Sequence, residues 1–144
     1  MGIRSFLFGD KTEIRKEILD PELGRLVWVE DDESWKGTFS GINFLLSFET
    51  GKDAPSKEVR DYALSVLKSP SILMDALDAE KKKYISKYPR YEKEVGALRY
   101  DMVSFYRTKS RADRIIASLG PGEDYRGWRI EFAGHVCEGL GFDS

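Results

Sequence analysis

The sequence contains one cysteine and one histidine, Cys137 and His135, among its 144 residues. A lone cysteine cannot form an internal disulfide, and such sparse use of cysteine is typical of proteins in a reducing compartment. The two residues stand two apart, a spacing that would place both on one face of a strand, where Glu138 or a distant carboxylate could join them around a metal. Zinc sites usually have four ligands, however, so we predict neither a metal site nor a bound cofactor.

The sequence also lacks a long apolar run, since none approaches the roughly 18 residues that a membrane-spanning helix needs. The opening segment, Met1–Phe8, is too short for a secretory signal. Position 6 holds Phe6, where N-myristoylation requires serine or threonine. The sequence therefore predicts a cytoplasmic protein without a membrane partner.

An excess of charge of one sign is missing as well, because 23 basic side chains stand against 25 acidic ones and the net charge is -2. Such a protein is not expected to coat nucleic acid over its whole surface. With 41% hydrophobic residues the composition is neither disordered nor fibrous, and 144 residues fit one domain with a full core. We expect a single α+β domain over residues 1–144.

The middle of the sequence has the hydrophobic spacing of two amphipathic helices. The first is expected to begin after the N-cap Ser56 and to end at Ser69-Pro70, which also starts the second. The second is expected to end at Pro89. The apolar stripe of the first helix consists of Val59, Tyr62, Ala63, Val66 and Leu67.

Both ends of the sequence show strand patterns. Four strands are predicted before the helices, over Glu13–Ile18, Gly24–Glu30, Trp35–Ser40 and Ile42–Glu49. Four more are predicted after them, over Leu98–Arg107, Arg114–Leu119, Trp128–Phe132 and Val136–Phe142. The fold class that follows is α+β, with a mostly antiparallel sheet built from N-terminal and C-terminal strands and two central helices packed on one face.

Two of these strands carry more specific expectations. The nearly continuous apolar run Ile42–Glu49 indicates a central strand that is covered on both faces. In the strand after the helices, simple alternation places five residues on one face, namely Leu98, Tyr100, Met102, Ser104 and Tyr106.

Motifs for catalysis and for nucleotide binding are absent. The segment Gly9-Asp10-Lys11-Thr12 matches the end of a phosphate-binding loop, but Arg4 stands where the first glycine belongs. Neighbours on one strand face lie too far apart for a cysteine–histidine dyad. We therefore predict a protein that is not an enzyme and has no catalytic residues. A carboxylate-based enzyme remains the alternative, because the acidic residues offer many pairs whose distances the sequence does not reveal.

Charge is unevenly distributed along the chain. Between Lys81 and Arg114 there are eleven basic and four acidic residues, a net charge of +7, so the remainder carries -9. Five of the seven tyrosines lie in the same stretch. Nine residues of this stretch are candidates for binding a partner or a polyanion: Lys81, Lys82, Lys83, Lys87, Arg90, Tyr91, Lys93, Arg107 and Arg111.

Three short segments resemble a small bacterial family of unknown function. They are Asp20-Pro21-x-Leu23-Gly24-x-Leu26, Trp35-x-Gly37 and Trp128-x-Ile130-x-Phe132. The resemblance extends over most of the chain and implies a hairpin-rich start, a helical centre and a C-terminal meander. Similar small proteins are grouped with immunity proteins that neutralise toxins, so the resemblance implies a binding or accessory role.

These observations lead to a ranked set of functions. The first is a non-catalytic intracellular domain that binds another protein, since the charges are segregated and catalytic motifs are missing. The alternative is binding of single-stranded nucleic acid or another polyanion through residues 81–114, although helical spacing already explains some of the tyrosines. A homodimer through the outermost strands is a further option.

Overall fold

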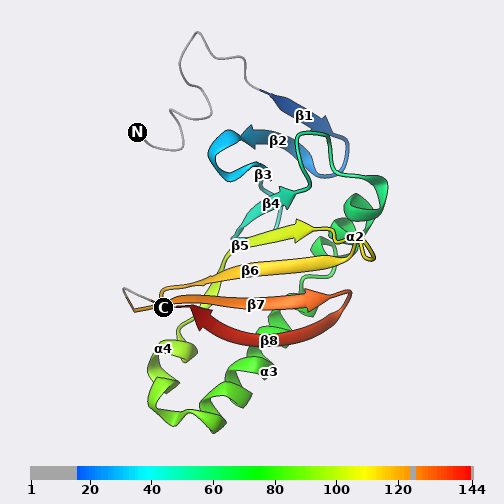
Figure 1. Cartoon of the computed structure of the whole chain (residues 1–144). Coiled ribbons are helices and arrows are strands. Elements are labelled where there is room, and N and C mark those ends of the chain that lie inside the picture. Colours follow the sequence, from blue (N-terminus) through cyan, green and yellow to red (C-terminus); the bar gives the residue numbers. More distant parts are fainter. Residues whose placement is uncertain (1–15, 124–125, 144) are drawn as a thin grey trace.

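The computed structural model describes residues 16–123 and 126–143 of the chain. All eight strands belong to one sheet with the order β1-β2-β3-β4-β5-β6-β7-β8 (Figure 1). The strands are β1 (Glu17–Asp20), β2 (Gly24–Val29), β3 (Ser34–Gly37), β4 (Leu45–Glu49), β5 (Arg99–Tyr106), β6 (Arg114–Gly120), β7 (Gly127–Ala133) and β8 (Val136–Asp143). Between β4 and β5 come α2 (Lys57–Leu67), α3 (Ser71–Lys87), the 3-10 turn η2 (Pro89–Tyr91) and α4 (Glu92–Gly96), and a second 3-10 turn, η1 (Glu30–Asp32), joins β2 to β3.

The α+β prediction is confirmed. Every neighbouring pair of strands is antiparallel except β4 and β5, which are parallel because the helical segment returns the chain across the sheet. In the part of the chain that the structure describes, three helices pack against the sheet, one more than expected. The additional helix is the short α4, which follows Pro89 directly and has too few residues to show a helical period.

The helix boundaries agree with the local signals. The Ser56 side chain accepts a hydrogen bond from the Val59 amide, which is the expected N-cap of α2. The predicted stripe of α2 faces the sheet, with Val59, Ala63 and Val66 fully buried. In α3, Leu73 and Leu77 are the buried residues.

The central strand is shorter than predicted. It begins at Leu45 instead of Ile42, because Gly41 adopts a positive φ of 89° and the Ile42 amide closes a turn onto the carbonyl of Phe39. Leu46, Ser47 and Phe48 are all buried, so β4 is covered on both faces as expected. Of the first predicted strand, residues 13–15 lie outside the described part, and β1 continues to Asp20.

The simple alternation predicted for β5 is wrong. The register shifts between Tyr100, which pairs with Leu119, and Met102, which pairs with Ser118. The extra residue, Asp101, forms a bulge, so the side chains before and after it exchange faces. Tyr100 therefore lies on the helix-covered face, where its hydroxyl donates to the Leu73 carbonyl at 2.7 Å.

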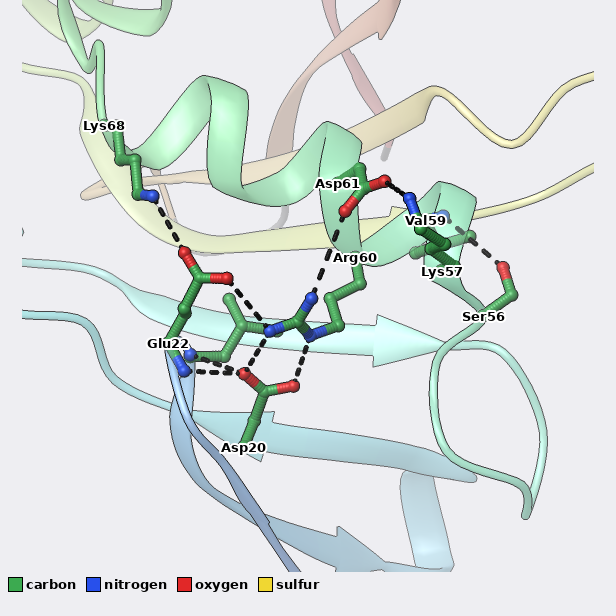
Figure 2. A network of polar contacts seen from close by, with 9 residues as sticks. Asp20, Glu22, Ser56, Lys57, Val59, Arg60, Asp61 and Lys68 are labelled. Carbon is green, nitrogen blue, oxygen red and sulfur yellow. Dashed lines mark hydrogen bonds and ion pairs between the residues drawn. The ribbon is translucent and has the colours of Figure 1, made fainter.

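A polar network attaches the first hairpin to α2 (Figure 2). Arg60 of α2 donates to both carboxylate oxygens of Asp20, from Nε at 2.5 Å and from Nη2 at 3.0 Å. Arg60 also contacts Glu22, which accepts a second bond from Lys68 at 2.9 Å. Asp20 in addition accepts from the amides of Glu22 and Leu23, in a turn of the kind that Asp-Pro sequences commonly form.

Replacing Asp20 with asparagine is expected to reduce stability in a pH-dependent way. The hydrogen bond from Arg60 lowers the pKa of Asp20 from 3.8 to about 2. A lowered carboxyl pKa contributes stability above its ordinary value that is lost as the pH falls toward 2, so Asp20→Asn should cost about 2 kcal/mol at pH 7. Urea unfolding at pH 7 and at pH 2–4 measures this. Asp31→Asn, in the exposed turn η1, is the matched control, and an equal loss in both variants would contradict the assignment.

The helices of the described residues, α2, α3 and α4, do not combine the length and the hydrophobicity that a membrane-spanning segment requires.

Candidate functional site

The nine candidate residues separate into two groups at opposite ends of β5. Seven lie on α3, η2 and α4: Lys81, Lys82, Lys83, Lys87, Arg90, Tyr91 and Lys93. Arg107 and Arg111 follow the other end of β5, on the loop beside α2 in Figure 1. An eight-residue strand spans roughly 26 Å, so the structure brings seven of the nine together and leaves two apart.

The local contacts of the cations differ. Arg111 forms a bidentate pair with Asp113 at 2.7 and 2.8 Å, and the Nζ of Lys81 donates to the Gly96 carbonyl at 3.2 Å. Partial burial lowers the pKa of Lys81. Lys83 pairs with Glu80 on the preceding turn of α3 at 3.2 Å.

Lys87, Arg90 and Lys93 are exposed, and among the described residues none of them has a carboxylate oxygen within 4.0 Å. Instead, Lys87 lies over the ring of Tyr88 at 5.4 Å, and Arg90 lies over the ring of Tyr91 at 5.0 Å. We call Lys83, Lys87, Arg90 and Lys93 the basic end of the protein. Apart from Lys83, whose charge Glu80 neutralises, these cations are offered to the solvent without a carboxylate partner in the described fold.

An aromatic cluster anchors the basic end to the sheet. Its five rings come from α3, the segment after it, β7 and β8, and they are Tyr84, Tyr88, Tyr91, Trp128 and Phe142. The ring of Tyr84 lies 5.2 Å from that of Trp128 in an edge-to-face arrangement, and Trp128 lies 4.8 Å from Phe142. The rings of Tyr84, Tyr88 and Tyr91 therefore pack against one another, and those of Tyr84 and Tyr91 also pack against the buried Trp128.

A largely buried carboxylate, that of Glu94, lies next to this cluster and contacts Trp128. It accepts from Arg126 at 2.5 Å, from the indole nitrogen of Trp128 at 2.6 Å and from the amide of Glu123 at 3.0 Å. The hydrogen bond from Arg126 lowers the pKa of Glu94 from 4.5 to about 2. Arg126 in turn lies over the Tyr91 ring at 5.3 Å. This network fixes α4 against the loop between β6 and β7.

A first hollow, of about 360 Å³, lies between α3 and β8. The α3 side contributes Glu80, Lys83, Tyr84, Lys87 and Tyr88, and the β8 side contributes Glu138, Gly139 and Leu140. We call it the α3–β8 groove. Its polar groups are mostly charged, and its apolar surface comes from two tyrosines and a leucine, a combination that suits a peptide carrying both charged and apolar side chains.

A second hollow, of about 590 Å³, lies between the η2–α4 segment and the loop after β6. Arg90, Lys93 and Arg126 supply its positive charges. Glu94 neutralises Arg126, so the net charge offered to a ligand there comes from Arg90 and Lys93 against Glu123. The basic end therefore borders both hollows.

The structure also pairs a serine with a lysine, which sequence reasoning did not anticipate. The register places Lys36 opposite Ser47, and the lysine donates to the Ser47 hydroxyl at 3.1 Å. Ser47 is 0% exposed, so its hydroxyl is not accessible to a substrate. The contact gives the buried Ser47 hydroxyl a hydrogen-bond partner on the sheet face opposite the helices.

Carboxyl groups with a perturbed pKa do not indicate acid catalysis. The pKa is lowered at Asp20, Glu22, Glu94 and Asp113, in each case chiefly by a hydrogen bond from a lysine or arginine. A general acid requires the opposite shift, toward a protonated carboxyl at neutral pH.

His135 and Cys137 do not share a site. His135 occupies the turn between β7 and β8, where its ring stacks on that of Tyr62 at 6.5 Å. Cys137 packs against the hydrophobic core, and burial raises the pKa of its thiol. In residues 16–123 and 126–143 there is no group of three or more His, Cys, Asp or Glu side chains arranged to hold a metal.

Sequence reasoning missed the β8 wall of the groove and the carboxylate under the aromatic cluster. In the sequence, Glu94 is one of the few acidic residues in a basic stretch. Its partners Arg126 and Trp128 stand 32 and 34 positions later, so no local pattern connects them with it. Gly139 and Leu140 gave only the signal of a strand weakened by glycine.

In comparisons with known proteins, no family model, curated protein or solved structure matches the chain.

Proposed function

We propose that the protein is a non-catalytic binding or accessory domain that docks another protein through its basic end. The observation that carries the proposal is that Lys87, Arg90 and Lys93, which have no carboxylate partner among the described residues, border the two hollows. Unneutralised cations around a concave, partly aromatic surface favour an acidic protein partner, because charge complementarity accelerates encounter and selects the partner.

The packing of the tyrosine rings favours a protein partner over a single-stranded nucleic acid. Nonspecific nucleic-acid binders present aromatic rings on which bases stack. Here the Tyr84 and Tyr91 rings pack against Trp128, and Tyr100 is buried beneath α3. Tyr88, at 37% exposure, remains the most accessible ring of the aromatic cluster.

The proposal includes a setting and a type of partner. A lone cysteine supports a cytoplasmic location. The resemblance to proteins grouped with immunity proteins supports a partner that is a toxin, which the domain would neutralise by occupying its surface.

Reversing the charge of the basic end is expected to abolish capture of the partner. The triple variant Lys87→Glu, Arg90→Glu, Lys93→Glu should lower affinity by about tenfold or more, because attractive contacts become repulsive. The partner is first recovered with the wild-type protein from a native lysate at moderate salt. Its affinity for each variant is then measured by surface plasmon resonance.

The matched control is Lys52→Glu, Arg107→Glu, Lys109→Glu, which makes the same charge change at exposed positions away from the basic end. Its affinity should stay close to that of the wild type. Equal losses in the two variants, or failure of the wild type to recover any stoichiometric protein, would contradict the proposal. Salt-dependent anisotropy of a labelled oligonucleotide would favour the nucleic-acid alternative instead.

A further inference from the structure

The last strand of the sheet, β8, has an open edge. It pairs with β7 on one side, and among the described residues no backbone group beyond β7 bonds to its other side. Alternate residues of an edge strand direct their N–H and C=O groups outward, which makes the edge a template for another strand.

The α3–β8 groove runs along this edge. Four residues of α3 and its C-cap Tyr88 line it at positions i, i+3, i+4, i+7 and i+8, which form one ridge from Glu80 to Tyr88. The ridge is about 12 Å long, the length of roughly four residues of extended chain. No residue of β7 lines the groove, so the hollow is bordered by the edge strand and not by the interior of the sheet.

One face of β8 carries little side-chain bulk. A Cβ atom added at Gly139 or Gly141 would meet nothing within 4 Å. The register shift of β8 lies at its beginning, between the pairs of Glu131 and Phe132, and pairing is regular from Gly139 to Asp143.

Charges in the groove favour an acidic segment. The carboxylate of Glu80 is paired with Lys83 at 3.2 Å, and that of Glu138 is paired with Arg114 at 2.8 Å. Lys87 has no such partner among the described residues. The groove thus offers one unneutralised cation beside the apolar surfaces of Tyr84, Tyr88 and Leu140.

We propose that β8 accepts an extended acidic segment of the partner protein as a ninth strand, with a carboxylate of that segment on Lys87 and an apolar side chain against Tyr84 and Leu140. The proposal rests on the protein-binding function and names the chemistry of the bound segment. Main-chain hydrogen bonds to β8 supply affinity, and the alternate side chains that face α3 supply specificity.

The test uses a capped octapeptide, acetyl-Thr-Glu-Thr-Val-Thr-Glu-Thr-Val-amide, whose glutamates and valines share one face when it is extended. Binding is followed by amide chemical shifts and hydrogen exchange of the full-length protein. We expect a dissociation constant below about 1 mM. Shifts and new exchange protection should appear at residues 139–142 and not at β1, the strand at the other end of the sheet.

Three comparisons isolate the chemistry. The same peptide with lysine in place of glutamate should bind about tenfold more weakly or not at all. Lys87→Glu should weaken binding of the acidic peptide by a similar factor, whereas Lys82→Glu, an exposed position on α3 outside the groove, should leave it unchanged. Retention of the native chemical-shift pattern outside the groove shows that each variant is folded.

The results also distinguish this proposal from the function it rests on. Peptide binding without protection of residues 139–142, or no binding at millimolar peptide, overturns the added strand, while capture of a partner protein through the basic end would still stand. Protection at 139–142 that rises with protein concentration before peptide is added shows a second copy at the edge, and it also overturns the proposal. Loss of partner capture with peptide binding intact overturns only the docking function.

Discussion

Replacing Glu94 with glutamine is expected to lower the free energy of unfolding by about 3 kcal/mol, the usual loss when one member of a buried ion pair is removed. The side chains of Glu94 and Arg126 are only 9% and 12% exposed. Among the described residues, the hydrogen bonds to the carboxylate all come from donors, on Arg126, Trp128 and Glu123. An amide nitrogen would face these donors, and the guanidinium would lose the carboxylate that it contacts at 2.5 Å.

The pH dependence separates this effect from a general loss of packing. Because Arg126 lowers the pKa of Glu94 to about 2, the wild type keeps the stabilisation above the ordinary value of 4.5 and loses it as the pH falls toward 2. The difference between wild type and Glu94→Gln in urea unfolding should therefore be largest at pH 7 and shrink in acid. Glu92→Gln, at an exposed position on α4, is the control. A difference that does not change with pH would contradict the ion-pair account.

Replacing Phe105 with alanine is expected to cost about 4 kcal/mol, the range found when a buried phenylalanine leaves a cavity. Phe105 is 0% exposed and lies where the parallel strands β4 and β5 meet the helices. Its ring stacks on Phe48 at 5.3 Å and meets the edge of Tyr62 of α2 at 5.9 Å. One substitution therefore removes contacts within the sheet and between the sheet and α2.

The adjacent residue provides the comparison for this variant. Tyr106 lies on the opposite face, where its hydroxyl accepts from Arg114 at 3.2 Å. Tyr106→Phe should cost about 1 kcal/mol or less, since one partly exposed hydrogen bond is removed. Guanidinium unfolding of both variants measures the difference. Similar losses in the two would mean that the helices do not cover the face that carries Phe105.

The helices and the fold class were predictable because their signals are local. Ser56, Pro70 and Pro89 each limit the conformations of their own neighbours, so the helix ends can be located without tertiary information. The parallel contact between β4 and β5 follows from a crossover that contains helices.

The β5 bulge could not be predicted in this way. On both sides of Asp101, polar and apolar residues alternate with or without a bulge, so the sequence pattern does not locate it. In the folded protein the bulge places Tyr100 where its hydroxyl donates to the Leu73 carbonyl of α3. Such a contact joins positions 27 apart in the sequence and leaves no periodic signal.

The candidate site was only half predictable for the same reason. Counting charges located the basic end, because Lys83, Lys87, Arg90 and Lys93 are close in sequence. Counting could not show that Arg107 lies at the far end of β5. Nor could it show that β8 forms the opposite wall of the groove, because strand order is a property of the whole sheet.

Hydrogen exchange of the protein, alone and bound to the partner that it captures, tests the central claim most directly. A docking surface at the basic end predicts slower amide exchange on binding at residues 83–93 and 139–142. Exchange at the loop that carries Arg107 and Arg111 should be unchanged. Protection confined to that loop, or to β1–β3, with none at α3 and β8, would contradict the account.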